Sequence, residues 1–180
     1  LKLHNEPLLN ALCIFCEKIG TDKSIIQGAG GNVSIKIDDI IWVKASGTWL
    51  ADANRKNIFV PLNLKKIQND FANCDFEKLK NIGDEYIVEE YNTLNLKPSI
   101  ETLFHAIMPQ KIVVHAHSMN SIILSCLENG WQLVHKANDY NNLVFIDYFK
   151  PGLQLAKAVY EKIDKNAKSR FIRRAWLCMH

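Results

Sequence analysis

The spacing of apolar residues predicts a helix near the start of the chain. Apolar side chains recur every three or four residues over 7–20, which is the period of one buried face on an α-helix. The apolar stripe comprises Leu8, Leu9, Leu12, Cys13, Phe15, Cys16 and Ile19. Pro7 is a good first-turn residue and Gly20 is a typical stop. We therefore expect one amphipathic helix from about Pro7 to Gly20.

A switch to strict alternation predicts a β-hairpin after this helix. Apolar and polar residues alternate over 33–37, Asp38-Asp39 has turn character, and a second apolar run follows over 40–44. Alternation is the period of a strand, and a short turn joins antiparallel neighbours. Residues 32–44 should therefore form a hairpin.

Further helices and strands alternate through the rest of the chain. We expect strands over 58–62, 112–115, 143–148 and 175–179, helices over 63–72, 99–107, 119–127 and 153–164, and a short helix near 86–92. Ser99 is the expected N-cap of its helix, and Ile112, Val113 and Val114 form an apolar run that is typical of a buried strand. The pattern indicates a layered α/β domain with a mixed or antiparallel sheet.

The composition excludes several classes of protein. A chain of 180 residues with a net charge of +3 has room for one core, and its scattered lysines form no nucleic-acid-binding surface. No apolar stretch approaches the roughly 20 residues that span a bilayer. The five cysteines, an odd number in apolar segments, indicate reduced thiols and a cytoplasmic location. Cys13 and Cys16 have the spacing of a redox or zinc motif, but their place in the apolar stripe favours two core cysteines.

Two histidines at the end of an apolar strand indicate chemistry. His115 and His117 are two residues apart, so an extended strand projects both imidazoles from one face. Imidazole nitrogen is a zinc ligand, and α/β sheets place ligands at the carboxyl ends of their strands. Glu101 lies early in a predicted helix, where the helix dipole favours an ionised carboxylate. Singly these are ordinary core, surface or first-turn residues, but their combination predicts a metal site beside an acid/base.

A glycine-rich loop precedes the predicted hairpin. Gly28-Ala-Gly-Gly31 lacks the third glycine of a dinucleotide-binding motif, because Val33 stands at that position and a hairpin rather than a helix follows. Its bare backbone would let amide groups approach an anion closely. Ser46-Gly47 is a second such loop, and Ser99 at a helix start is a third point suited to an anion. Each of these segments taken alone is most simply a turn, but all three beside one metal ion would form a pocket for a phosphate or a carboxylate.

Five ordered motifs give the chain a resemblance to the class II aldolase/adducin family. They are Gly-Gly-Asn-Val-Ser (30–34), Val-Lys-Ala-Ser-Gly-Thr (43–48), Pro-Ser-Ile-Glu-Thr-Leu-Phe-His (98–105), Val-Val-His-Ala-His-Ser (113–118) and Pro-Gly-Leu (151–153). The resemblance implies a single domain over 1–180, cut short at its C-terminus. The implied fold is a three-layer α/β/α sandwich around a central mixed, mostly antiparallel sheet. The resemblance also implies a homotetramer with its sites at subunit interfaces.

The resemblance further implies roles for individual residues. His115 and His117 would bind zinc, and Glu101 would be an acid/base that also approaches the metal. The third histidine ligand is either His180 or a residue beyond the end of the given sequence. A tyrosine from a neighbouring subunit often assists protonation of the aldehyde, and Tyr140 is the candidate here. The substrate's phosphate would be bound by Gly31, Asn32, Ser46, Gly47 and Ser99.

The expected activity is that of a zinc-dependent aldolase acting on a sugar, in particular a sugar phosphate. Zinc would stabilise the enediolate formed when a ketose is cleaved, and Glu101 would move the proton. The same scaffold supports an epimerase, a dehydratase or a decarboxylase acting on small molecules. A non-catalytic adducin-like binding module and a closed structural zinc site are the alternatives from other classes.

Overall fold

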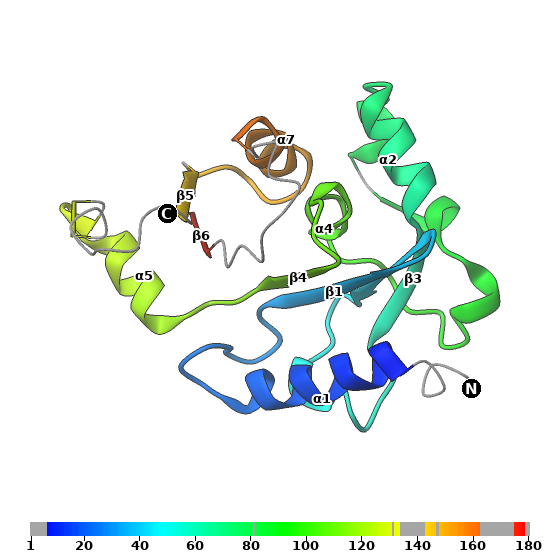
Figure 1. Cartoon of the computed structure of the whole chain (residues 1–180), viewed down its shortest axis with the longest axis horizontal. Helices are drawn as coiled ribbons and strands as arrows, with labels where there is room; N and C mark the ends of the chain where they lie inside the picture. The colour runs from blue at the N-terminus through cyan, green and yellow to red at the C-terminus, as the bar shows by residue number, and fades with distance from the viewer. Residues whose placement is uncertain are drawn as a thin grey trace.

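The computed structural model describes residues 7–80, 82–130, 132–133, 143–146, 148–162 and 175–178 of the chain (Figure 1). Its strands are β1 (Asn32–Ile37), β2 (Ile40–Lys44), β3 (Phe59–Asn63), β4 (Ile112–His115), β5 (Leu143–Ile146) and β6 (Ala175–Cys178). Its helices are α1 (Pro7–Thr21), α2 (Leu64–Ala72), α3 (Phe76–Leu79), α4 (Thr102–Ile107), α5 (Met119–Cys126) and α7 (Leu153–Lys162). Short 3-10 turns lie at Leu50–Asp52, Asp84–Tyr86 and Glu89–Tyr91.

The main sheet is antiparallel and brings together strands that are far apart in the sequence. Its strand order is β3-β2-β1-β4, and all three neighbouring pairs are antiparallel. Strands β5 and β6 form a separate parallel pair. Helix α1 covers one face of the main sheet, while α2, α4 and α7 lie on the other (Figure 1). The expected α/β fold with a mostly antiparallel sheet is therefore confirmed.

The hairpin and the next strand–helix unit form where local chemistry predicts. Strands β1 and β2 are joined at Asp38, whose φ of 51° is a left-handed conformation that Asp tolerates in turns. Pro61, which has no amide hydrogen to donate, lies in β3 at the edge of the main sheet. The side chain of Asn63 accepts a hydrogen bond from the Lys66 amide at 2.9 Å and so caps α2.

Helix α1 packs its apolar stripe against one face of the sheet. Leu9, Leu12, Cys13 and Cys16 are buried, and they pack with Val33 and Ile35 of β1 among others. Both thiols are free and in the core, as predicted. Leu8 and Phe15 were also predicted in the stripe, but they are 44% and 41% exposed. They lie roughly 100° or more around the helix from Leu9, so the stripe that faces the sheet is narrower than the sequence indicates.

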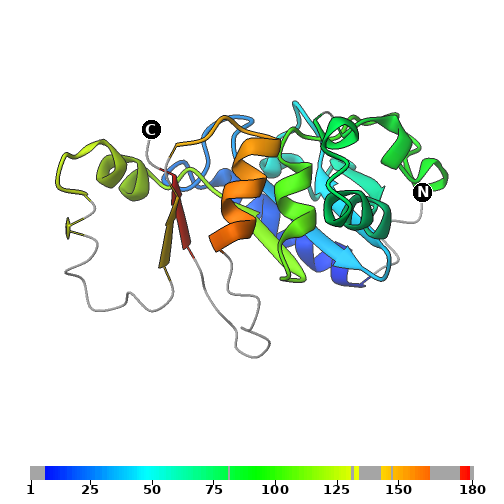
Figure 2. The same ribbon diagram turned by 90° about the horizontal axis from the view of Figure 1, so that it is seen from above.

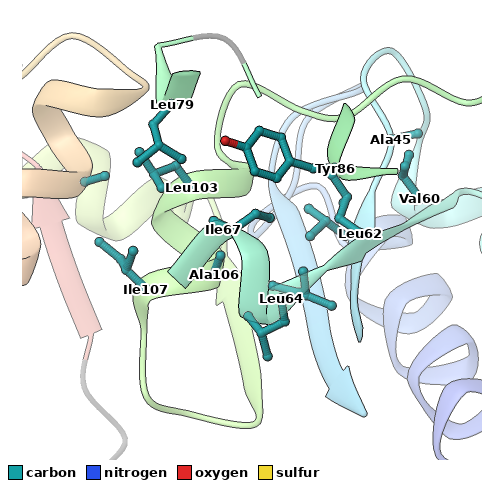
Figure 3. Packing of buried hydrophobic residues seen from close by; sticks show 13 residues of the cluster. Ala45, Val60, Leu62, Leu64, Ile67, Leu79, Tyr86, Leu103, Ala106 and Ile107 are labelled. Atoms are coloured by element: carbon teal, nitrogen blue, oxygen red, sulfur yellow. The ribbon is translucent and has the colours of Figure 1, made fainter. Parts of the chain in front are cut away.

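A second apolar cluster fills the space between the sheet and the opposite helices. Figure 3 shows Leu62 of β3, Ile67 of α2 and Leu103 and Ala106 of α4 within this cluster. Tyr86 is also fully buried there and donates a hydrogen bond from its hydroxyl to Asp70 at 2.8 Å. Helices α4 and α7 lie side by side over the sheet (Figure 2). This core holds α4 firmly on the sheet, directly after the segment that carries Glu101.

Three local expectations were wrong. The helix expected from Ser99 begins instead at Thr102. The Ser99 hydroxyl accepts a hydrogen bond from the Glu101 amide at 3.3 Å, and this turns the chain before the helix starts. The run expected to be a buried strand is only half buried: Val113 lies in the core, but Ile112 and Val114 are 49% and 42% exposed, because β4 is the outermost strand of its sheet. The helix expected near 86–92 is instead a pair of 3-10 turns.

None of the helices in the described ranges is long and apolar enough to cross a bilayer.

Candidate active site

The two histidines lie where β4 leaves the main sheet. His115 is the last residue of β4 and pairs with Asn32, the first residue of β1. His117 follows two residues later, and the two imidazole ring centroids are 4.8 Å apart with an interplanar angle of 62°. Both side chains are half buried. The antiparallel pairing of β1 with β4 thus brings both rings next to the loop that precedes β1.

The Glu101 carboxylate lies against the first of these rings. Its Oε1 atom is 2.7 Å from His115 Nδ1, and the side chains are 16% and 34% exposed respectively. Burial by itself raises the pKa of Glu101, but the hydrogen bond and the charge of His115 and a hydrogen bond from Asn32 outweigh it, so this pKa lies below its usual value. Glu101 is therefore ionised at neutral pH. Because a carboxylate only accepts hydrogen bonds, His115 Nδ1 is the donor in this contact, and in the neutral form of the ring this leaves the lone pair on Nε2.

The chemistry of this set fits a divalent metal ion, although the described residues alone do not close a site. Two imidazoles and one carboxylate are ligands that zinc accepts, and a histidine held by a carboxylate at one nitrogen is oriented to bind metal through the other. Within the described ranges, no group of three or more His, Cys, Asp or Glu side chains is arranged to hold an ion. His115 and His117 are the residues that would hold one, with Glu101 beside them. A further donor would come from water, the substrate or a residue outside the described part of the chain.

The double glycine of the first loop lets its backbone pack on the histidines. A Cβ atom at Gly30 would lie 3.0 Å from His117 Nδ1, and one at Gly31 would lie 2.9 Å from the His115 carbonyl oxygen. Gly31 also has a φ of 69°, in the region that disfavours residues with side chains. The side chain of Gln27 donates to the His117 carbonyl oxygen at 3.2 Å. The loop therefore supports the positions of both histidines, whether or not it also binds an anion.

A buried lysine joins the two glycine loops. Lys44, at the end of β2, donates from Nζ to the carbonyl oxygens of Ala29 at 3.1 Å and Thr48 at 2.7 Å. Burial lowers the pKa of its ammonium, while the charge of Glu101 partly offsets this effect. Lys44 is therefore close enough to Glu101 for the two charges to attract each other. Sequence reasoning missed Lys44 because its partners lie on two separate loops.

The third expected anion-binding point lies next to the second loop. The Ser46 amide donates to the Lys97 carbonyl oxygen at 3.0 Å, which joins this loop to the segment that carries Ser99. Ser46 and Gly47 are exposed and Ser99 is half buried, so all three are open to a ligand. The structure thus brings the expected substrate-binding residues into one connected group of loops, linked through Asn32 and Glu101 to the histidines.

A further histidine, His105, was also missed as a candidate. It is fully buried on α4, one helical turn after Glu101, and its Nδ1 atom lies 2.8 Å from Ser34 Oγ. Burial lowers the pKa of His105 to about 3, so its ring is neutral at physiological pH. The i, i+4 spacing from Glu101 was the available sign, since it places both side chains on one face of a helix.

Two expected site residues lie outside the described residues. They are Tyr140, expected to assist protonation, and His180, one of the two alternatives for the third histidine ligand. Their roles stay predictions.

Comparison with known proteins supports the family that the motifs indicate. A model of the "Class II Aldolase and Adducin N-terminal domain" matches residues 10–175. In Bacillus subtilis (strain 168), the uncharacterized oxidoreductase YuxG is 30% identical over 168 residues, which are 86% of this chain but 23% of that protein. In Methanococcus maripaludis, the L-fuculose phosphate aldolase is 27% identical over 146 residues, which are 77% of this chain and 66% of the relative. The chain thus spans about a quarter of the first relative and two thirds of the second.

A solved structure shares the arrangement of helices and strands. The N-terminal class II aldolase domain of a conserved protein from Thermoplasma acidophilum superposes with a TM-score of 0.65 and 25% sequence identity. The alignment covers 86% of this chain and 75% of that domain. Together with the family model over residues 10–175, it shows that this chain belongs to the class II aldolase and adducin N-terminal domain family.

Proposed function

We propose that this domain is the catalytic part of a divalent-metal-dependent enzyme that cleaves a carbon–carbon bond of a sugar phosphate. The observation that carries the proposal is the ionised Glu101 carboxylate, 2.7 Å from His115 Nδ1 and beside the paired ring of His117. A non-catalytic binding module has no need of a buried carboxylate held against a pair of histidines spaced to bind a metal ion. The relative from Methanococcus maripaludis, which is named an L-fuculose phosphate aldolase, supports the choice of substrate class.

His115 and His117 would hold the metal, which we propose is zinc, with a third histidine at His180 or beyond the given sequence. When bound, zinc acts as a Lewis acid that polarises the carbonyl group of a ketose. In the cleavage direction, the bond between the α- and β-carbons of the ketose breaks as the hydroxyl on the β-carbon loses its proton. The α-carbon, next to the carbonyl, later takes up a proton. Glu101 is ionised and only slightly exposed, so it can accept the proton and return it. We assign assistance at the aldehyde end to Tyr140.

The connected loops are proposed to bind the phosphate. Backbone amides in glycine loops and serine hydroxyls are donors that suit a phosphate. The Lys44 ammonium beneath two of the loops adds a positive charge. The proposed substrate-binding residues are Gly31, Asn32, Ser46, Gly47 and Ser99.

We also propose a homotetramer that works in the cytoplasm. Exposed apolar side chains on β4 and α5, such as Ile112, Val114 and Ile123, support burial against another subunit. The free thiols of Cys13, Cys16, Cys74 and Cys126 support a reducing compartment.

The test is turnover of L-fuculose 1-phosphate and related ketose 1-phosphates by the zinc-loaded full-length protein, measured as aldehyde release. Glu101→Gln should lower kcat by about 10²–10⁴-fold, because a general acid/base contributes that much, while some zinc binding is kept. Glu77→Gln is the matched control, because its side chain is 82% exposed and forms a surface ion pair with Lys80. Full activity in Glu101→Gln would show that the assigned role is wrong.

The same incubations separate the alternative reactions by their products. An epimer of the substrate would indicate an epimerase, loss of water a dehydratase, and loss of carbon dioxide a decarboxylase. A folded full-length protein that binds no divalent metal and turns over no sugar would favour a non-catalytic binding module.

A further inference from the structure

Strand β1 presents three polar side chains to α4 where an apolar face would be expected. Asn32, Ser34 and Lys36 alternate with the buried residues Val33 and Ile35, which pack on the α1 side. Asn32 and Ser34 are themselves buried. A sheet face that lies under a helix is normally apolar, so this row of polar groups calls for partners on the helix.

Each of the three polar residues has a partner in or beside α4. The Ser34 hydroxyl lies 2.8 Å from His105 Nδ1, across 71 residues of sequence. Lys36 donates from Nζ to the carbonyl oxygens of Met108 at 2.6 Å and Gln110 at 2.8 Å, just after the helix ends. Asn32 hydrogen-bonds to the Glu101 carboxylate just before the helix begins. The helix is therefore held to one strand by polar contacts at its beginning, middle and end.

The central contact is poorly explained by stability alone. His105 is fully buried, and within the described part of the chain its Nε2 atom has no hydrogen-bond partner. A buried polar atom without a partner lowers stability, so an apolar side chain would pack here at less cost. The Ser34–His105 hydrogen bond instead fixes the position of α4, because it restricts both sliding of the helix along its axis and rotation about it. The backbone joins this point directly to Glu101, whose carbonyl oxygen accepts the His105 amide at 3.1 Å.

We infer that Ser34 and His105 are positioning residues that set the Glu101 carboxylate against His115 Nδ1. Strand β1 is the common reference: Asn32 pairs with His115 on one side of it, while Ser34 holds the helix that carries Glu101. The inference rests on the proposed function only in assigning a catalytic use to the Glu101–His115 contact. The contact itself is measurable in the metal-free protein.

The experiment measures the tautomer of His115 in the full-length, metal-free protein by long-range ¹H–¹⁵N correlation spectra. A carboxylate at Nδ1 favours the Nδ1–H tautomer, whereas a free imidazole prefers the Nε2–H form. Wild type should show Nδ1–H, and Ser34→Ala and His105→Leu should shift the population towards Nε2–H. His105→Asn, whose amide stands near the Nδ1 position, should restore much of the wild-type state. Tyr86→Phe is the matched control, because it removes a different buried hydrogen bond from the same core layer.

A second measurement tests the consequence for metal binding. Calorimetric titration with zinc should show about 10–100-fold weaker binding for Ser34→Ala and His105→Leu, the usual cost of losing a group that orients a ligand. An unchanged His115 tautomer in both folded variants, whatever their stability, would show a merely structural role and overturn the inference. If wild type binds no zinc and cleaves no sugar phosphate, the proposed function fails, but the tautomer spectra still decide the positioning role.

Discussion

Lowering the pH should destabilise this fold through one histidine. His105 is fully buried and neutral, and its pKa falls from 6.5 to about 3 because burial disfavours the charged ring. In the unfolded chain the same ring takes up a proton below about pH 6.5. Because the unfolded state then binds a proton that the folded state excludes, stability is highest above pH 6.5 and falls as the pH drops towards 3.

The size of the effect follows from the two pKa values of His105. From pH 6.5 to pH 5, a span of 1.5 units, protonation of the unfolded state lowers the free energy of unfolding by about 1.4 kcal/mol per pH unit, or about 2 kcal/mol in total. The charged groups that act on the ring partly oppose one another: Glu101 raises the pKa of His105, while His115 and Lys36 lower it. Glu101 stays ionised over this interval, because its own pKa lies below 4.5.

Urea unfolding of the metal-free protein, followed by circular dichroism at pH 7 and pH 5, measures this loss. The free energy of unfolding should fall by about 2 kcal/mol more in wild type than in His105→Asn or His105→Leu, neither of which titrates at this position. Comparing wild type with variants cancels the contribution of the other histidines and carboxylates. Equal pH dependence in all three proteins would refute the assignment of a buried neutral ring.

Two further predictions concern the loops around the site. Gly30→Ala should weaken zinc binding about 10-fold, because the new Cβ would lie 2.9 Å from the Gln27 carbonyl oxygen and 3.0 Å from His117 Nδ1, so the loop and that ring must shift. Gly28→Asn is the calorimetric control, because a Cβ there would meet nothing within 4 Å and Asn tolerates the φ of 57°. Lys44→Met should lower the free energy of unfolding by about 2 kcal/mol, because two carbonyl groups lose a charged donor. Hydrogen exchange should then speed up over 28–31 and 46–48, whereas exposed Lys65→Met should leave it unchanged; slow exchange in Lys44→Met would contradict the bridging role.

Elements with strong local patterns could be predicted from the sequence. The helix after Pro7, the hairpin around Asp38 and the Asn63-capped helix each depend on contacts within a few residues, so their patterns are complete in a short window. The start of α4 was misplaced because Ser99 can either cap a helix or turn the chain before it. Only packing of Leu103 and Ala106 into the core shows where the helix lies.

The pairing of the two histidines was also a local property, because a spacing of two residues in extended chain brings side chains to one side. Their contact with Glu101 was not. It depends on β1 pairing with β4 and on α4 lying over β1, and both arrangements join distant parts of the sequence. His105 and Lys44 were missed for the same reason, since a buried polar residue in an apolar pattern shows no sign of which distant group will satisfy it.

The sequence by itself therefore determined the kinds of element, the family and the residues that we propose bind metal and move protons. These follow from local periodicity and from the order of short motifs. The tertiary structure decided which of those residues meet, how deeply each is buried and hence which are charged. Burial and hydrogen bonding set the protonation state of Glu101 and His105, and both depend on contacts that exist only once distant segments of the chain have packed together.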